Sequence, residues 1–206
     1  MHNNSMIKKN KIILTDCDGV CLDWEFGFQT WMTTHGHDIQ EKDVYSVARQ
    51  YDLTKTKAKS LVEIFNSSAS MGFLPPLRDS QYYIKLLAEK LGYKFIAVTS
   101  LSHDESAQKL RTCNLKKLFG EDTFLEYHYL GCGDDKDEIL TELAAKYHGS
   151  IWVEDKYINA EVGHELGFDA LLMEHGHSLN YVGPARVVKN WEDIYNYVIR
   201  REQDSA

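Results

Sequence analysis

The stretch "IILTDCDGVCLDWE", residues 12–25, decides the fold of this 206-residue chain. Its apolar, β-branched beginning is typical of a short buried strand. Two acids, Asp16 and Asp18, follow that strand at once, with Gly19 directly after them. Like charges this close repel each other, and apolar surroundings strengthen the repulsion. We therefore expect a cation near these two acids.

Four later segments also have the pattern of strands, and helical patterns separate them. The predicted strands are Lys94–Ser100, Phe124–Leu130, Ser150–Asp155 and Phe168–Met173. The helical patterns with an apolar stripe cover Gln81–Leu91 and Lys136–Tyr147. Strands that alternate with amphipathic helices form βαβ units and a mostly parallel sheet. We therefore predict a Rossmann-like three-layer α/β core, in which ligands bind beyond the carboxyl ends of the strands.

One segment interrupts this alternation. Residues 22–75 carry helical patterns and no convincing strand, and Pro75 and Pro76 stop any helix there. We predict that this segment is a small helical cap inserted after the first strand. The remaining residues, 1–21 and 76–206, would form the α/β core domain.

Composition limits the kinds of partner. The net charge of −8 argues against a nucleic-acid polymer, because such a partner needs a basic face. No apolar run approaches the ~20 residues that span a bilayer, so we expect no membrane partner. The four cysteines form no Cys-x-x-Cys pair, and no stretch has the pattern of a secretion signal, so we expect a cytoplasmic location. Composition leaves the oligomeric state open.

Side chains that suit a phosphate site lie where the predicted strands end. These side chains are Asp16, Asp18, Thr99, Ser100, Glu154 and Asp155. Helix starts are expected at Ser102–Glu105, which has a capping-box pattern, and at Lys136, with Asp135 as N-cap. Hydroxyls, a lysine and helix N-termini together favour a phosphate group. Clustered carboxylates with no arginine in the motif suit Mg²⁺, whose charge would relieve their repulsion.

The order of these motifs resembles the haloacid dehalogenase-like superfamily of phosphotransferases. "TDCDGV" is similar to the Asp-x-Asp-Gly motif of that family, and "AVTS" to its Thr/Ser motif. Lys136 corresponds to its lysine motif, and "VED" followed by Asn159 to its acidic motif. The resemblance covers residues 12–173 in the chain order of the family. Each motif alone is weak, whereas four in order are specific.

This resemblance implies a phosphatase or phosphomutase with a haloacid dehalogenase-like core. Asp16 would be the nucleophile that forms an aspartyl-phosphate, and Asp18 would act as acid and then as base. An acid at position 18 distinguishes the phosphatases from the dehalogenases, which need neither that acid nor a metal. Mg²⁺ would be bound by the Asp16 carboxylate, the Asp18 backbone carbonyl and Asp155.

The resemblance also implies roles around the phosphate. Thr99, helped by Ser100, would bind the transferring phosphoryl group, and Lys136 would screen Asp16 from its charge. Glu154 stands where the family more often has glycine. It would reach the metal through water or hold Lys136, and Asn159 would lie in the same outer layer.

A narrower resemblance concerns the substrate. "DCDGVCLDWEFGFQTW", "FLPPL" and "VTSL" are similar in layout to segments of the 5′(3′)-deoxyribonucleotidases. Aromatic residues of the cap stack on the nucleobase in that family, and Trp24, Phe26 and Phe28 are the candidates by position. The expected ligand is therefore a small phosphorylated metabolite, with a nucleoside monophosphate as the best candidate. Because "PPLRD" and "TSL" depart from that family, a sugar phosphate or another small metabolite is the alternative, for a phosphatase or a phosphomutase.

Other classes of protein fit parts of the pattern. An EF-hand loop has its glycine at position 6 between helices, whereas Gly19 would be position 4 after a strand. A receiver domain has an adjacent acidic pair and a separate phospho-acceptor before its Thr. A non-catalytic relative that only binds phosphate-bearing partners stays the alternative to an enzyme. The His-Gly-His pairs at 35–37 and 175–177 lack partners at metal-ligand spacing, so we interpret them as loop residues.

Overall fold

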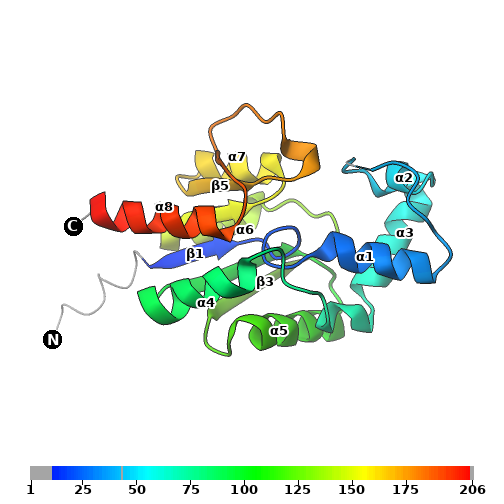
Figure 1. Ribbon diagram of the computed structural model, residues 1–206, viewed down its shortest axis with the longest axis horizontal. Helices are drawn as coiled ribbons and strands as arrows, with labels where there is room; N and C mark the ends of the chain where they lie inside the picture. Colours follow the sequence, from blue (N-terminus) through cyan, green and yellow to red (C-terminus); the bar gives the residue numbers. More distant parts are fainter. Residues whose placement is uncertain (1–10, 43, 205–206) are drawn as a thin grey trace.

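The centre of the molecule is one parallel sheet (Figure 1). The structure, a computed structural model, describes residues 11–42 and 44–204. Within these residues the sheet has six strands in the order β3-β2-β1-β4-β5-β6. The strands are β1 Ile12–Thr15, β2 Lys94–Ser100, β3 Phe124–Leu130, β4 Ile151–Glu154, β5 Asp169–Met173 and β6 Arg186–Val188. All neighbours pair in parallel, which confirms the predicted sheet type.

Helices cover both faces of the sheet. On one face lie α4 Ser80–Leu91, α5 Glu105–Phe119 and α8 Trp191–Asp204, and on the other α6 Asp137–Tyr147 and α7 Tyr157–Glu165. Successive side chains of a strand face opposite sides, so Ile13 packs in the first layer and Leu14 in the second. The predicted three-layer α/β architecture is therefore confirmed. No helix among the described residues is long and apolar enough to cross a membrane.

Strand β1 lies in the interior of the sheet, which places the acidic stretch between two neighbouring strands. Leu14 pairs with Ile96 of β2 on one side and with Trp152 of β4 on the other. The backbone N–H of Asp16 continues this ladder by donating to the carbonyl oxygen of Val153 at 2.9 Å. Because the strands are parallel, the carboxyl ends of β1, β2 and β4 lie at the same edge of the sheet.

The segment between β1 and α4 forms helices beyond the end of β1 (Figure 1). They are α1 Trp24–Thr34, α2 Val47–Gln50, α3 Lys55–Asn66 and the short 3-10 helix η1 Ala69–Gly72. The side chains of Asp23 and Thr54 cap α1 and α3 by accepting from backbone N–H groups of the first turn. Phe28 and Phe65 pack inside, with ring centroids 5.3 Å apart. We call residues 24–72 the helical insert; its status as a separate domain with the expected boundaries stays a prediction.

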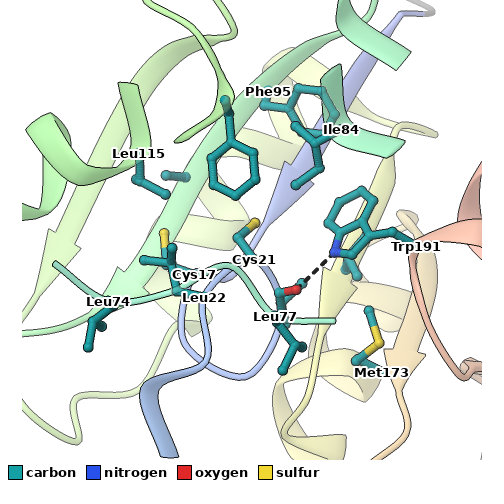
Figure 2. Packing of buried hydrophobic residues seen from close by; sticks show 14 of the residues in the cluster. Cys17, Cys21, Leu22, Leu74, Leu77, Ile84, Phe95, Leu115, Met173 and Trp191 are labelled. Atoms are coloured by element: carbon teal, nitrogen blue, oxygen red, sulfur yellow. Dashed lines mark hydrogen bonds between the residues drawn. The ribbon is translucent and has the colours of Figure 1, made fainter. Parts of the chain in front are cut away.

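The loop after β1 rests on the core layer that contains α4, α5 and α8 (Figure 2). Cys17 and Cys21 are fully buried there, in one apolar cluster with Phe95 and Trp191. Trp191 also donates its indole N–H to the carbonyl oxygen of Val20 at 2.8 Å, which ties the loop to this core layer (Figure 2). Because Cys17 points into this core, the acids on either side of it are left to face the other way. All four cysteines are free thiols.

Two helix starts differ from the prediction. A capping box from Ser102 is expected, but Asp104 caps α5, because its carboxylate accepts from the backbone N–H groups of two residues in the first turn. Asp135 is the expected N-cap of α6, but Lys136 occupies that position and the helix begins at Asp137. The N-cap lies outside the regular helix, so the lysine side chain can turn toward the sheet instead of following a helical face.

Candidate active site

Asp16 lies where β1 ends and is only 8% exposed. One carboxylate oxygen, Oδ1, accepts the backbone N–H of Cys17 at 2.6 Å. The other, Oδ2, faces the ammonium group of Lys136 at 2.8 Å. Burial raises the pKa of Asp16 to about 6, although the charge of Lys136 acts in the opposite direction. Asp16 is thus a buried carboxylate with a donor on each oxygen.

Lys136 is buried between two acids. Its Nζ lies 2.8 Å from Asp16 Oδ2 and 2.7 Å from Glu154 Oε2. Burial alone would lower the pKa of Lys136, but the two carboxylates outweigh it and raise the pKa above its usual range. Glu154 also accepts from the side chain of Asn159 at 3.2 Å and from two backbone N–H groups at 3.0 Å. In this arrangement Glu154 holds Lys136 in place, and Asn159 helps to hold Glu154.

Asp155 completes an acidic group that fits a divalent cation. Carboxylate oxygens of Asp16, Glu154 and Asp155 all lie within 4.8 Å of one another. Gly19, at a φ of +72°, passes so close that a Cβ atom there would overlap the Asp155 carboxylate. Burial raises the pKa of Asp155 to about 7, and repulsion from Asp16 adds to this. An oxygen-only donor set with this much negative charge suits a hard ion such as Mg²⁺.

The carboxylate of Asp18 has a different partner, Arg111 of α5. Nη1 of the arginine lies 2.7 Å from Oδ1, and Nη2 lies 3.3 Å from Oδ2. Burial raises the pKa of Asp18 to about 6, against the lowering effect of the guanidinium. Arg111 lies 93 positions from Asp18 and in none of the motifs that predict the site. One feature of the sequence does point to Arg111. It falls on the same buried stripe of α5 as Ala107 and Leu115, where an apolar residue would be usual.

The two hydroxyl residues at the end of β2 lie in different surroundings. Ser100 lines the cavity next to the acids and donates its hydroxyl to the carbonyl oxygen of Asp134 at 3.2 Å. Thr99 is fully buried, and within the part of the chain that the structure describes its hydroxyl has no hydrogen-bond partner. Of the predicted pair, Ser100 and not Thr99 is among the residues that line the described cavity.

A cavity of about 520 Å³ lies between this edge of the sheet and the helical insert. Its wall on the insert is largely apolar or aromatic, and includes Trp24, Val44, Tyr45, Val47 and Val62. Of the three predicted stacking residues, only Trp24 is in this wall. Phe28 is buried inside the insert, stacked on Trp24 at 4.6 Å, and Phe26 is 58% exposed outside the described cavity lining.

Two histidines interpreted from the sequence as loop residues also line the cavity. His175 is the N-cap of the short 3-10 helix η2, Gly176–Ser178, and His177 lies within it. Nε2 of His175 donates to the carbonyl oxygen of Gly19 at 2.6 Å. The ring of His177 packs edge-on against Tyr45 of the insert, with centroids 4.9 Å apart. These contacts connect the loop after β5 to the acidic loop and to the insert.

Comparison with known proteins identifies the architecture. A hydrolase of the haloacid dehalogenase-like family from Streptococcus pneumoniae superposes with a TM-score of 0.63, covering 92% of this chain and 99% of that one at 17% identity. The chain has the haloacid dehalogenase-like fold. CbbY from Rhodobacter sphaeroides, solved with phosphate, gives a TM-score of 0.56 at 13% identity, with coverages of 89% and 96%. A β-phosphoglucomutase from Clostridium difficile gives 0.57 at 16% identity, with coverages of 95% and 98%.

Sequence comparison finds similarity to a viral protein. An uncharacterized 32.4 kDa protein of Enterobacteria phage T4, from the Gp30-rIII intergenic region, is 28% identical over 192 residues. The match covers 89% of this chain and 68% of that protein. No protein-family model matches the chain. The haloacid dehalogenase-like fold is therefore established here by structure rather than by close sequence identity.

Because Asp16 and Asp155 are buried, we predict that the stability of the metal-free protein depends on pH. An unfolded aspartate titrates near pH ~3.9, whereas burial raises the pKa of Asp16 to about 6 and that of Asp155 to about 7. Acids with a raised pKa stabilise the folded state fully below the unfolded pKa, and this stabilisation is lost as the pH rises through the folded pKa. In EDTA we therefore expect the melting temperature to fall between pH 5 and pH 8, by on the order of 5 °C.

Thermal denaturation of wild type and of Asp155→Asn over this pH range isolates the effect from other titrating groups. The variant should show a clearly smaller fall, and Mg²⁺ should raise the melting temperature of wild type more at pH 8 than at pH 5. Parallel curves for wild type and Asp155→Asn would show that this acid does not titrate as its burial requires.

Proposed function

We propose that this chain is a phosphomonoester hydrolase that works through Asp16. The observation that carries the proposal is the surroundings of this carboxylate, which lines a cavity and lies 2.8 Å from Lys136 in a group with Asp155. A carboxylate can attack phosphorus to form an acyl phosphate, and phosphoryl transfer depends mainly on positioning and on cations that neutralise the phosphate. The hydrolases and the phosphoglucomutase that share this fold support the same class of reaction.

The proposal includes Mg²⁺. Asp16 and Asp155 would hold the ion, together with the backbone carbonyl of Asp18. When bound, it would supply positive charge that offsets both the repulsion between the acids and the charge of the phosphoryl group. Lys136 and Ser100 would bind phosphate oxygens from the other side.

The reaction proceeds in two displacements at phosphorus. A carboxylate oxygen of Asp16 attacks, the bond between phosphorus and the ester oxygen breaks, and Asp18 gives a proton to the leaving oxygen. Asp18 then takes a proton from a water molecule as its oxygen attacks the phosphorus. The bond between phosphorus and Asp16 breaks, which releases inorganic phosphate and restores the carboxylate. The insert over the cavity excludes other water from the acyl phosphate.

We infer a nucleoside 5′-monophosphate as the substrate. The cavity volume of about 520 Å³ lies within the usual range for small-molecule sites. Its charged end at the sheet suits the phosphate, and the wall with Trp24, Val47 and Val62 suits a flat base. A phosphatase or phosphomutase for a sugar phosphate is the second candidate, favoured by the likeness to β-phosphoglucomutase. A protein that binds phosphate esters without turnover is the third.

A phosphate-release screen tests the function. Ribo- and deoxyribonucleoside monophosphates and a set of sugar phosphates are incubated with the purified protein in Mg²⁺ or in EDTA. We expect release in Mg²⁺ only, with the highest kcat/KM on a nucleoside monophosphate. Equal values on sugar phosphates would remove the nucleotide assignment, and isomerisation without release would indicate a mutase. Binding without turnover of any ester would leave only the non-catalytic alternative.

Substitution of Trp24 tests separately whether the substrate carries a nucleobase that stacks on this side chain. Loss of a stacking partner costs ~1–3 kcal/mol per base, so Trp24→Ala should raise KM for the nucleoside monophosphate about tenfold or more. KM for a small ester without a base, such as ethyl phosphate, should stay nearly unchanged. Trp31→Ala is the matched control, because Trp31 lies on the same helix and also packs on Phe28 but is not in the described cavity wall. An equal change for both esters would contradict stacking on Trp24.

A further inference from the structure

Arg111 is a buried cation that the two displacements do not use. It lies on α5, its side chain is fully buried, and both terminal nitrogens of the guanidinium face the carboxylate of Asp18. The side chain of Asp18 is 20% exposed and lines the cavity. The arginine therefore holds Asp18 from the protein side and leaves the cavity side of the carboxylate open.

The same face of α5 also holds the chain that leaves the insert. Nη2 of Arg111 donates to Sδ of Met71 in η1 at 3.1 Å. Asn114, almost one turn further along α5, donates its side-chain amide to the carbonyl oxygen of Leu74 at 3.0 Å. Arg111 thus contacts the acidic loop and the end of the insert at once, whereas the side-chain hydrogen bond that Asn114 makes to the described residues goes to the exit segment.

A contribution to stability does not by itself explain why Arg111 is paired with Asp18. Buried ion pairs are often no better for stability than apolar residues of similar volume, because two charges must leave water. What a guanidinium adds is geometry, since its planar fork fixes both oxygens of a carboxylate and a lysine ammonium does not. Proton transfer needs such fixation, because donor and acceptor must lie within hydrogen-bond reach.

We propose that Arg111 is a positioning residue that fixes the place and plane of the Asp18 carboxylate for proton transfer to the leaving oxygen. This inference rests on the proposed function, because it requires Asp18 to protonate the leaving group. It predicts a dependence on the leaving group that a purely structural arginine would not produce. An alkoxide needs a proton as it leaves, whereas p-nitrophenolate leaves readily without one.

The test compares Arg111→Lys with wild type on ethyl phosphate and on p-nitrophenyl phosphate. The quantity is kcat/KM, which covers the steps up to phosphoryl transfer to Asp16 and excludes hydrolysis of the acyl phosphate. General acid catalysis contributes about 10²–10⁴-fold, so we expect a loss of about 10²-fold on the alkyl ester. On the aryl ester the loss should stay below about threefold, because that leaving group needs no acid.

Asn114→Ala is the matched control, because it removes another buried polar contact from the same helix face without touching Asp18. It should lower kcat/KM equally on the two esters or not at all. In an Asp18→Asn background, Arg111→Lys should no longer change the ratio between the esters. Equal losses on both esters for Arg111→Lys would overturn the positioning role and leave the phosphatase proposal intact.

A measurement without substrate separates the two proposals further. Melting temperatures of Arg111→Met, Asp18→Asn and the double variant form a cycle. The double variant should lose less than the sum of the two single losses, because Asp18→Asn removes the charge that Arg111→Met leaves unpaired. If the losses of melting temperature were additive, Arg111 and Asp18 would not be coupled, and this conclusion would hold whether or not the protein releases phosphate. If the cycle shows coupling but wild type cleaves neither ester, the proposed function fails, and the positioning role fails with it.

Discussion

Asp16→Asn should abolish phosphate release while the protein stays folded. The amide is nearly the same size as the carboxylate but is too weak a nucleophile to form an acyl phosphate. Loss of a nucleophile removes most of an enzyme's rate enhancement, so we expect kcat to fall by at least about 10³-fold. A rapid-quench experiment with labelled substrate should trap phosphate on wild type and not on the variant. The melting temperature in EDTA at pH 8 should not fall, because a buried charge has been removed.

Asp104→Asn is the control for this substitution. Asp104 caps α5 far from the acids in sequence, and asparagine is an equally good N-cap, so kcat should change little. If the Asp16→Asn variant retained more than about a tenth of the wild-type kcat, covalent catalysis by this residue would be ruled out. Release with no trapped intermediate would instead indicate direct attack by water.

Lys136→Met should give the largest loss of stability of the variants considered. Lys136 is 2% exposed and lies between Asp16 and Glu154, so its removal leaves two buried acids facing each other. Breaking a buried ion pair in this way costs about 3–5 kcal/mol. We expect a loss of this size in the free energy of unfolding measured with urea in EDTA. Activity should be lost as well, because the phosphate would lack its screening cation.

Helix α6, whose N-cap is Lys136, offers a matched control in Lys146→Met. Lys146 also pairs with an acid, Glu126, but its side chain is 58% exposed. Exposed ion pairs contribute about 0–1 kcal/mol, so this variant should unfold almost like wild type. A second variant, Lys136→Met with Glu154→Gln, should recover part of the lost stability because one of the unpaired charges is gone. Equal, small losses for Lys136→Met and Lys146→Met would contradict the buried pairing.

The sequence predicts the inner part of the fold well for a physical reason. Strands buried on both faces need continuous apolar runs, and β1, β2 and β4 have them. β6 is missed because it is three residues long and two of these are exposed, which leaves no apolar run to detect. α8 is also missed, although Trp191, Ile194 and Val198 do follow a helical period on its buried face.

The candidate site is predicted less completely, because its partners come from distant segments. Short motifs identify Asp16, Lys136 and Asp155, and the structure does gather these three side chains. Pattern alone cannot say which of two adjacent hydroxyl residues lines the cavity, because successive side chains of a strand face opposite sides, and here Ser100 does. Arg111 lies in no motif, and only the unusual position of an arginine on an apolar helical stripe points to it.

The interior position of β1 also determines when the site can form during folding. Asp16 is near the beginning of the chain, but its backbone N–H pairs with Val153, and Gly19 lies against Asp155. A nascent chain that has not yet reached β4 can pair β1 with β2 but leaves the other edge of β1 open. Such distant pairings close long loops and form slowly. The acids are therefore brought together late, after most of the chain has been synthesised, so a partly made chain carries the nucleophile without the site.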